Sequence, residues 1–158
     1  ASSAASDVYK RQQYEYDKGL KCYSITVDLE MIGKDKNFNM EALPEEKAER
    51  VILLLNAIQN LSLVVKGNLD NAEPIFIVGG LSDRKTHYFE NVVHVKEDKL
   101  ELSEDLIQKK NQGFYAGLLK GQALLNEDEI EEKLQTIGVS EFFSKLGEDV
   151  KTYFDVMK

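Results

Sequence analysis

The stretch GLKCYSITVDLEMIG, residues 19–33, decides the fold class because apolar and polar side chains alternate along it. The apolar positions are Tyr23, Ile25, Val27, Leu29 and Met31. The intervening positions are Cys22, Ser24, Thr26, Asp28 and Glu30. Successive side chains of a strand point to opposite faces of its sheet, so this pattern predicts a strand over residues 20–32 with one face in the core. A polar loop is expected at residues 33–37.

A long helix is expected next, from Pro44 to Lys66. Proline suits the first helical position, and the glutamates that follow it lie near the positive end of the helix dipole. Helical spacing puts one set of apolar residues on a common face: Val51, Leu54, Leu55, Ile58, Leu61 and Val65. Gly67 is a typical residue for the position just beyond a helix end.

The rest of the chain predicts two more strands and then helices. A polar turn at residues 68–73 precedes a short buried strand, PIFIV, at residues 74–78. A second strand, rich in aromatic and β-branched residues, is expected at residues 87–95, with a turn at Asp98. The order of one strand, a long helix, further strands and then helices indicates an α+β fold.

Helical patterns continue from Ser103 to the end of the chain. Ser103 is expected to cap one helix, Asn126 an acidic helix that ends at Leu134, and Ser140 the last helix. The last helix has an apolar face made of Phe142, Phe143, Leu146, Val150, Tyr153, Phe154 and Met157. This face is expected to join the core.

Composition bounds the class of protein. The chain has 158 residues, 42% of them hydrophobic, which suits one globular domain. Its single cysteine, Cys22, cannot form an internal disulfide, which favours a reducing, cytoplasmic location. No run approaches the ~18 apolar residues of a membrane span, so no membrane partner is expected.

The net charge of −8 counts against a general polyanion binder. The acidic excess is uneven along the chain. Residues 50–89 contain four basic and three acidic residues, whereas residues 101–158 contain seven basic and twelve acidic ones. Because charges farther apart than a Debye length of about 8 Å are largely screened, a local cationic site is compatible with this balance.

The first twelve residues, which begin ASSAAS, show neither helical nor strand periodicity and lack the regions of a signal peptide. We interpret residues 1–12 as a foreign or disordered leader. Residues 13–158 are then expected to form the domain.

Two segments carry the residue types of a phosphate-binding surface. The first is the predicted helix end with Lys66 and Asn68, and the second is the loop GGLSDRK at residues 79–85, which Thr86 separates from His87. Backbone amides near glycine can approach phosphates, and basic side chains supply charge. His87, Tyr88 and Phe89 could add stacking surface for bases. The candidate phosphate-binding residues, for which the resemblance described below implies RNA-binding, are Lys66, Asn68, Gly79, Gly80, Arg84, Lys85 and His87. The alternative is a helix cap, a glycine turn and a solvated basic loop.

We expect no catalytic residue, metal or cofactor. Asp28 and Glu30 share a strand face and could coordinate a metal or perform acid–base work. Such charges more commonly serve solubility, or they could meet a neighbouring subunit. The residues His87, His94 and Cys22 lack the spacing of a metal cluster. No combination of nucleophile, base and orienting residue can be assembled, so the sequence predicts no enzyme.

Several segments together resemble the CRISPR-associated DevR autoregulator family, the backbone subunits of type I-B complexes in the RAMP superfamily. They are residues 19–33, residues 49–61, KGN at 66–68, PIFIVGG at 74–80, and the tail with SEFF at 140–143. The resemblance covers about residues 14–157 and corresponds to the C-terminal half of that family. It implies a partial ferredoxin-like, or RRM-like, core with added helices, and residues 13–158 would be the C-terminal part of one such domain.

The resemblance also implies a function. Subunits of this family polymerise along a guide RNA (crRNA), hold it through its backbone, and leave pairing with target DNA to the RNA bases. The implied partners are the guide RNA, copies of the same subunit, other surveillance-complex subunits, and target DNA through the RNA. Two alternatives stay open: a DNA-binding autoregulator of its own operon, and an α+β protein-interaction module without affinity for nucleic acid.

Overall fold

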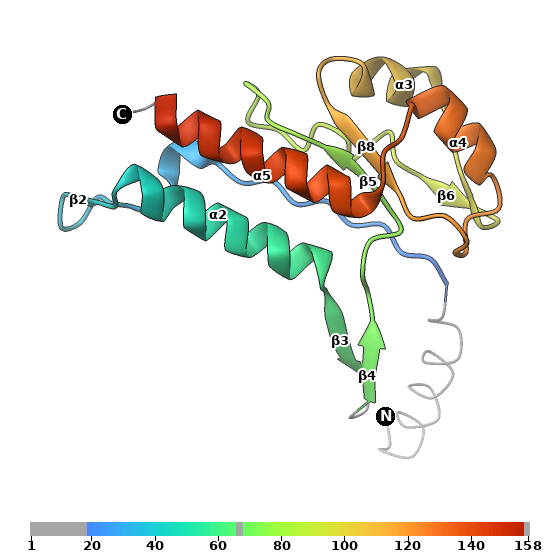
Figure 1. Ribbon diagram of the computed structural model, residues 1–158, viewed down its shortest axis with the longest axis horizontal. Helices are drawn as coiled ribbons and strands as arrows, with labels where there is room; N and C mark the ends of the chain where they lie inside the picture. Colours follow the sequence, from blue (N-terminus) through green and yellow to red (C-terminus); the bar gives the residue numbers. More distant parts are fainter. Residues whose placement is uncertain (1–18, 66–67, 157–158) are drawn as a thin grey trace, which may run out of the picture.

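The computed structural model describes residues 19–65 and 68–156 and has an α+β fold, as predicted (Figure 1). Its helices are α2 (Pro44–Gln59), α3 (Glu104–Lys110), α4 (Glu127–Leu134) and α5 (Val139–Val156), with a 3₁₀ turn η1 at Leu29–Met31. Its strands are β1 (Lys34–Asp35), β2 (Met40–Glu41), β3 (Ser62–Val65), β4 (Asn68–Asn71), β5 (Phe76–Gly79), β6 (Val95–Lys96), β7 (Lys99–Leu100) and β8 (Tyr115–Leu118).

The strands pair two by two, and every pair is antiparallel. β1 pairs with β2, β3 with β4, β6 with β7, and β5 with the distant β8. Within the described residues no sheet has more than two strands. The partial ferredoxin-like core implied by the resemblance stays a prediction, and the sheet with the most helical cover is the β5–β8 pair.

The β5–β8 pair is the centre of the fold because both of its faces are covered. On one face, Phe76 and Val78 of β5 lie with Ala116 and Leu118 of β8 against the buried Leu106 and its neighbours from α3 and α4. On the other face, Ile77 and Tyr115 lie against Val139, Phe142 and Phe143 of α5. The period-two alternation of a strand thus sorts these side chains into two cores.

α5 approaches the sheet closely at Gly117. A Cβ atom on this residue would lie 3.0 Å from Cβ of Phe142 and 3.1 Å from Cγ2 of Ile77, so only glycine fits without displacement. Further along the same apolar face, α5 packs on α2 through Val150 and Phe154, which meet Ala48 and Val51 (Figure 1). α3 and α4 therefore cover one face of the sheet and α5 the other, while α2 packs along the same apolar face of α5.

The strand predicted at residues 20–32 does not form. Residues 20–28 belong to no strand or helix, η1 occupies Leu29–Met31, and β1 begins inside the predicted loop, at Lys34. Figure 1 shows residues 20–28 as a drawn-out stretch without a turn. Alternation describes a strand's faces, but a strand also needs a neighbour for its backbone hydrogen bonds, and none of the described residues supplies one.

The long helix begins at Pro44 as predicted but ends at Gln59 and not at Lys66. The side chain of Asn60 donates to the carbonyl of Asn56 at 2.9 Å and closes the last turn. The chain then enters the β3–β4 hairpin, which projects away from the β5–β8 sheet (Figure 1). The predicted continuation over Leu61 and Val65 is wrong, and part of the polar turn expected at residues 68–73 is strand β4.

Other local predictions had mixed outcomes. The short strand at residues 74–78 is confirmed as β5, and the cap at Ser103 is confirmed because its Oγ accepts from the amide of Leu106 at 3.2 Å. The strand expected at residues 87–95 is wrong, since turns fill most of it and only Val95 is in a strand. α5 begins at Val139, so Ser140 lies inside the helix and does not cap it.

Asn126 precedes α4 as predicted, but its side chain does not cap the helix. Instead its amide exchanges two hydrogen bonds with the backbone of Leu100, at 3.0 and 2.9 Å. This interaction ties α4 to the β6–β7 hairpin, whose turn lies at Glu97 and Asp98. The apolar face of α5 is buried from Val139 to Phe154, and the predicted Met157 lies outside the described residues.

Candidate nucleic-acid interface

The basic loop predicted from the sequence leaves the end of β5. Gly79 is the last residue of that strand and pairs with Tyr115. Gly80 passes close to Phe114, where an added Cβ would lie 3.1 Å from Cδ1 of the ring. Ser82 accepts a hydrogen bond from the amide of Arg84 at 3.1 Å and turns the chain. Gly79 is therefore part of the strand, and Gly80 allows close packing against Phe114. The exposed side chains of Arg84 and Lys85 come later in the loop.

Three aromatic rings gather behind this loop. Tyr88 stacks on Phe114 with ring centres 5.2 Å apart, and Phe89 meets both rings edge-on at 5.2 and 5.0 Å. Tyr88 and Phe89 were expected to offer stacking surface for bases. They are instead packed mainly on each other and on Phe114, and each ring is half-buried.

Two cations lie beside Tyr88. The guanidinium of Arg84 is 5.6 Å from its ring centre, and the ammonium of Lys109 is 4.6 Å from the same point. Lys109 Nζ also donates to the carbonyl of Tyr88 at 2.8 Å. Among residues 19–65 and 68–156, neither cation has a carboxylate partner. Two uncompensated like charges at one ring create a local positive potential in an acidic protein.

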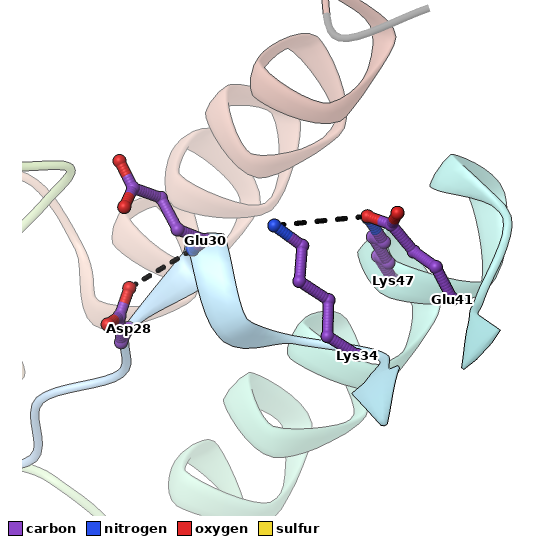
Figure 2. A network of polar contacts seen from close by, with 5 residues as sticks. All are labelled: Asp28, Glu30, Lys34, Glu41 and Lys47. Carbon is purple, nitrogen blue, oxygen red and sulfur yellow. Dashed lines mark hydrogen bonds and ion pairs between the residues drawn. The ribbon is translucent and has the colours of Figure 1, made fainter. Parts of the chain in front are cut away.

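Lys85, the next residue of the loop, is neutralised within the chain. Its Nζ lies 2.8 Å from a Glu30 carboxylate oxygen and 3.4 Å from one of Asp28. The hydrogen bond to Glu30, followed by that to Asp28, raises the pKa of the Lys85 ammonium. Asp28 also accepts from the amide of Glu30 at 3.1 Å, which holds the two acids together (Figure 2). These carboxylates therefore compete with any phosphate for Lys85.

His87 joins the same contact between the loop and residues 20–30. Its Nδ1 shares a hydrogen bond with Oγ1 of Thr26 at 2.8 Å. The loop and residues 26–30 are therefore linked by three side-chain contacts, from His87 and Lys85. Arg84 is the one predicted basic loop residue that this contact leaves uncompensated.

The structure does not bring the two predicted segments together. Lys66 lies outside the described residues, and Asn68 begins β4, at the tip of the hairpin that projects away from the sheet and its loop (Figure 1). The described candidates thus divide into a loop group, with Arg84, Lys85 and His87, and the separate position of Asn68.

A second charged cluster lies on the β1–β2 hairpin and the start of α2. The buried ammonium of Lys47 contacts Glu41, and Lys34 lies 4.0 Å from the same carboxylate (Figure 2). The hydrogen bond from Lys47 and its charge lower the pKa of Glu41. This cluster satisfies a buried lysine and joins the hairpin to α2, which is a structural role.

The described part of the chain also contains the residues that were considered for metal binding or catalysis. It contains no group of three or more His, Cys, Asp or Glu side chains able to hold a metal ion. Desolvation raises the pKa of the Cys22 thiol, so the weakly nucleophilic thiol form prevails at neutral pH. Asp28 and Glu30, considered above as metal or acid–base groups, are partners of Lys85.

Sequence reasoning missed two residues of this surface, Lys109 and Phe114. Lys109 is in the last turn of α3, where a lysine commonly interacts with the helix dipole, so nothing in its position indicated a surface site. Phe114 precedes β8, a strand that the sequence did not predict. Both reach the loop only because β8 pairs with β5.

No helix in residues 19–65 or 68–156 has both the length and the apolar character to cross a membrane. Comparisons with models of known families, with curated protein sequences and with solved structures find no match to this chain.

Proposed function

We propose that this chain is a structural, guide-RNA-binding backbone subunit of a type I CRISPR antiviral surveillance complex. In this role it acts in the cytoplasm, assembles with copies of itself and other subunits along crRNA, and meets target DNA through the RNA. The observation that supports the proposal best is the pair of uncompensated cations, Arg84 and Lys109, at the ring of Tyr88. An RNA phosphate placed between them would relieve their mutual repulsion.

The site suits recognition of the RNA backbone. A guanidinium and an ammonium bind phosphate oxygens regardless of which base the nucleotide carries. One face of the Tyr88 ring is already stacked on Phe114, so a base cannot stack on that face. A subunit that holds the backbone and leaves the bases unread matches the division of labour in guide-RNA complexes. Lys85 would contribute only where a phosphate displaces its two carboxylates.

The test is to express the genomic reading frame that contains residues 13–158 together with its repeat array, and to sequence the RNA that co-purifies. Repeat-derived RNAs of nearly uniform length are the expected result. Protein that is free of RNA, and that binds its own promoter duplex in a gel-shift assay, would point to the autoregulator instead. Protein that binds neither nucleic acid would be an interaction module.

Neutralising the acids around Lys85 is expected to strengthen RNA binding. Asp28→Asn with Glu30→Gln removes both carboxylate partners of Lys85, so its ammonium can contact one more phosphate. The plot of log affinity against log salt concentration is then expected to have a slope steeper by about 0.7. Fluorescence anisotropy with a labelled, unstructured single-stranded RNA at several salt concentrations measures both effects.

The matched control removes the same charge elsewhere. Glu141→Gln with Glu148→Gln on α5 frees two lysines that are remote in sequence from the loop, Lys145 and Lys151. Equal gains for the two double variants would mean that net charge alone sets the affinity and that Lys85 has no special position.

A further inference from the structure

Residues 22–27 have the sequence of a strand but form no strand hydrogen bonds with other described residues. Within residues 19–65 and 68–156, no backbone group of residues 22–27 is hydrogen-bonded to another backbone group. Tyr23 and Ile25, the apolar side chains at the centre, are 52% and 49% exposed. A row of free amides and carbonyls beside an apolar face is the property of an unpaired sheet edge.

Both ends of this segment are held in place. Leu20 packs against the core between the β5–β8 sheet and α3 and α4, and Leu29 packs against the core between α2 and α5. Near the second end, Thr26 bonds His87 and Asp28 pairs with Lys85. Because the chain is drawn out between two anchored ends, a pairing strand would find the backbone already ordered, which lowers the entropic cost of association.

The segment is complementary to itself. If two copies pair antiparallel about a two-fold axis through Ile25, that residue faces its own copy and Tyr23 faces Val27. On the other face, Ser24 then lies opposite Thr26. Apolar residues meet apolar ones, polar residues meet polar ones, and no charge opposes a like charge. Aromatic and β-branched residues are favourable cross-strand partners.

We propose that residues 22–27 form an antiparallel intermolecular strand pair with the same segment of a second copy, with Ile25 on the two-fold axis. The interface is isologous, so one surface serves both partners. It needs no nucleic acid, and its test on RNA-free protein is independent of the proposed RNA binding.

The first test measures the mass of the RNA-free 158-residue chain by sedimentation equilibrium under reducing conditions. We expect a concentration-dependent dimer. Ile25→Lys places two ammonium groups on the axis and is expected to give a monomer, while Ser24→Lys, on the other face and opposite Thr26, leaves the dimer intact. A wild-type monomer at all concentrations, or equal behaviour of the two lysine variants, overturns the proposal.

A second test fixes the register without relying on a disruptive change. In a Cys22→Ser background, Ile25→Cys puts two thiols directly opposite each other, within the ~4.4–6.8 Å Cα separation that a disulfide spans. Ser24→Cys puts its thiols on diagonal positions, about 7–8 Å apart, where the bond is disfavoured. Mild oxidation should give a covalent dimer for the first variant only. A covalent dimer that forms preferentially through position 24, or through neither position, contradicts the pairing.

Discussion

Replacing Phe142 with alanine is expected to lower the free energy of unfolding by about 3–5 kcal/mol. The side chain is 1% exposed and lies between α5 and the sheet, where its ring meets Tyr115 and Phe143 edge-on at 6.4 and 5.3 Å. Its backbone cannot move inward to fill the gap, because Cβ of Phe142 already marks the closest approach to Gly117. A domain's total stability is about 5–15 kcal/mol, so this loss is severe.

Urea unfolding followed by circular dichroism measures the change. The control is Leu53→Ala, which truncates an apolar side chain on α2 that is 60% exposed and is expected to change stability by about 0.5 kcal/mol or less. A similar, small effect for both variants would mean that the contact between α5 and the β5–β8 pair does not carry the fold.

The second large effect is expected for RNA binding. Arg84→Ala with Lys109→Ala removes both uncompensated cations, so two phosphate contacts are expected to be lost. The slope of log affinity against log salt concentration then becomes shallower by about 1.4. Affinity should fall most at low salt, where released counterions contribute most. Anisotropy titrations with unstructured single-stranded RNA across a range of salt concentrations give both quantities.

A matched control separates the site from net charge. Lys133→Ala with Lys151→Ala also removes two positive charges, but these lysines lie on α4 and α5 and already pair with Glu129 and Glu148. The control should leave the salt dependence unchanged. If both double variants lose the same affinity, RNA is attracted by overall charge and the surface at Tyr88 is not its site.

Local signals predicted the fold well where the relevant partner is close in the sequence. Pro44 and Ser103 mark helix starts because proline geometry and a serine hydroxyl act within one turn. Predictions failed where distant residues decide the outcome. Residues 20–28 alternate like a strand, but pairing depends on a neighbour that the sequence pattern cannot specify. Asn126 was expected to cap α4, but its amide binds Leu100, 26 residues away.

The candidate site was predictable in its loop and not in its surroundings. The sequence GGLSDRK indicated an exposed basic turn, and Arg84 and Lys85 are both exposed there. The sequence pattern could not show that only one of these two charges is neutralised. Lys85 meets Asp28 and Glu30, which lie 55 residues or more away in the sequence, whereas Arg84 meets no carboxylate in the described part of the chain. It also could not supply Lys109, because that residue reaches Tyr88 through the pairing of β5 with β8.

The open backbone of residues 22–27 has a consequence for the lifetime of the protein. Proteases bind their substrates as extended strands through main-chain hydrogen bonds, and exposed segments of this kind are preferred sites of cleavage. A cut here would place Leu20 and Leu29, which pack against different cores, on separate pieces of the chain. In the proposed strand pair each copy would shield the segment of the other, so the monomer is expected to be cleaved faster than the dimer.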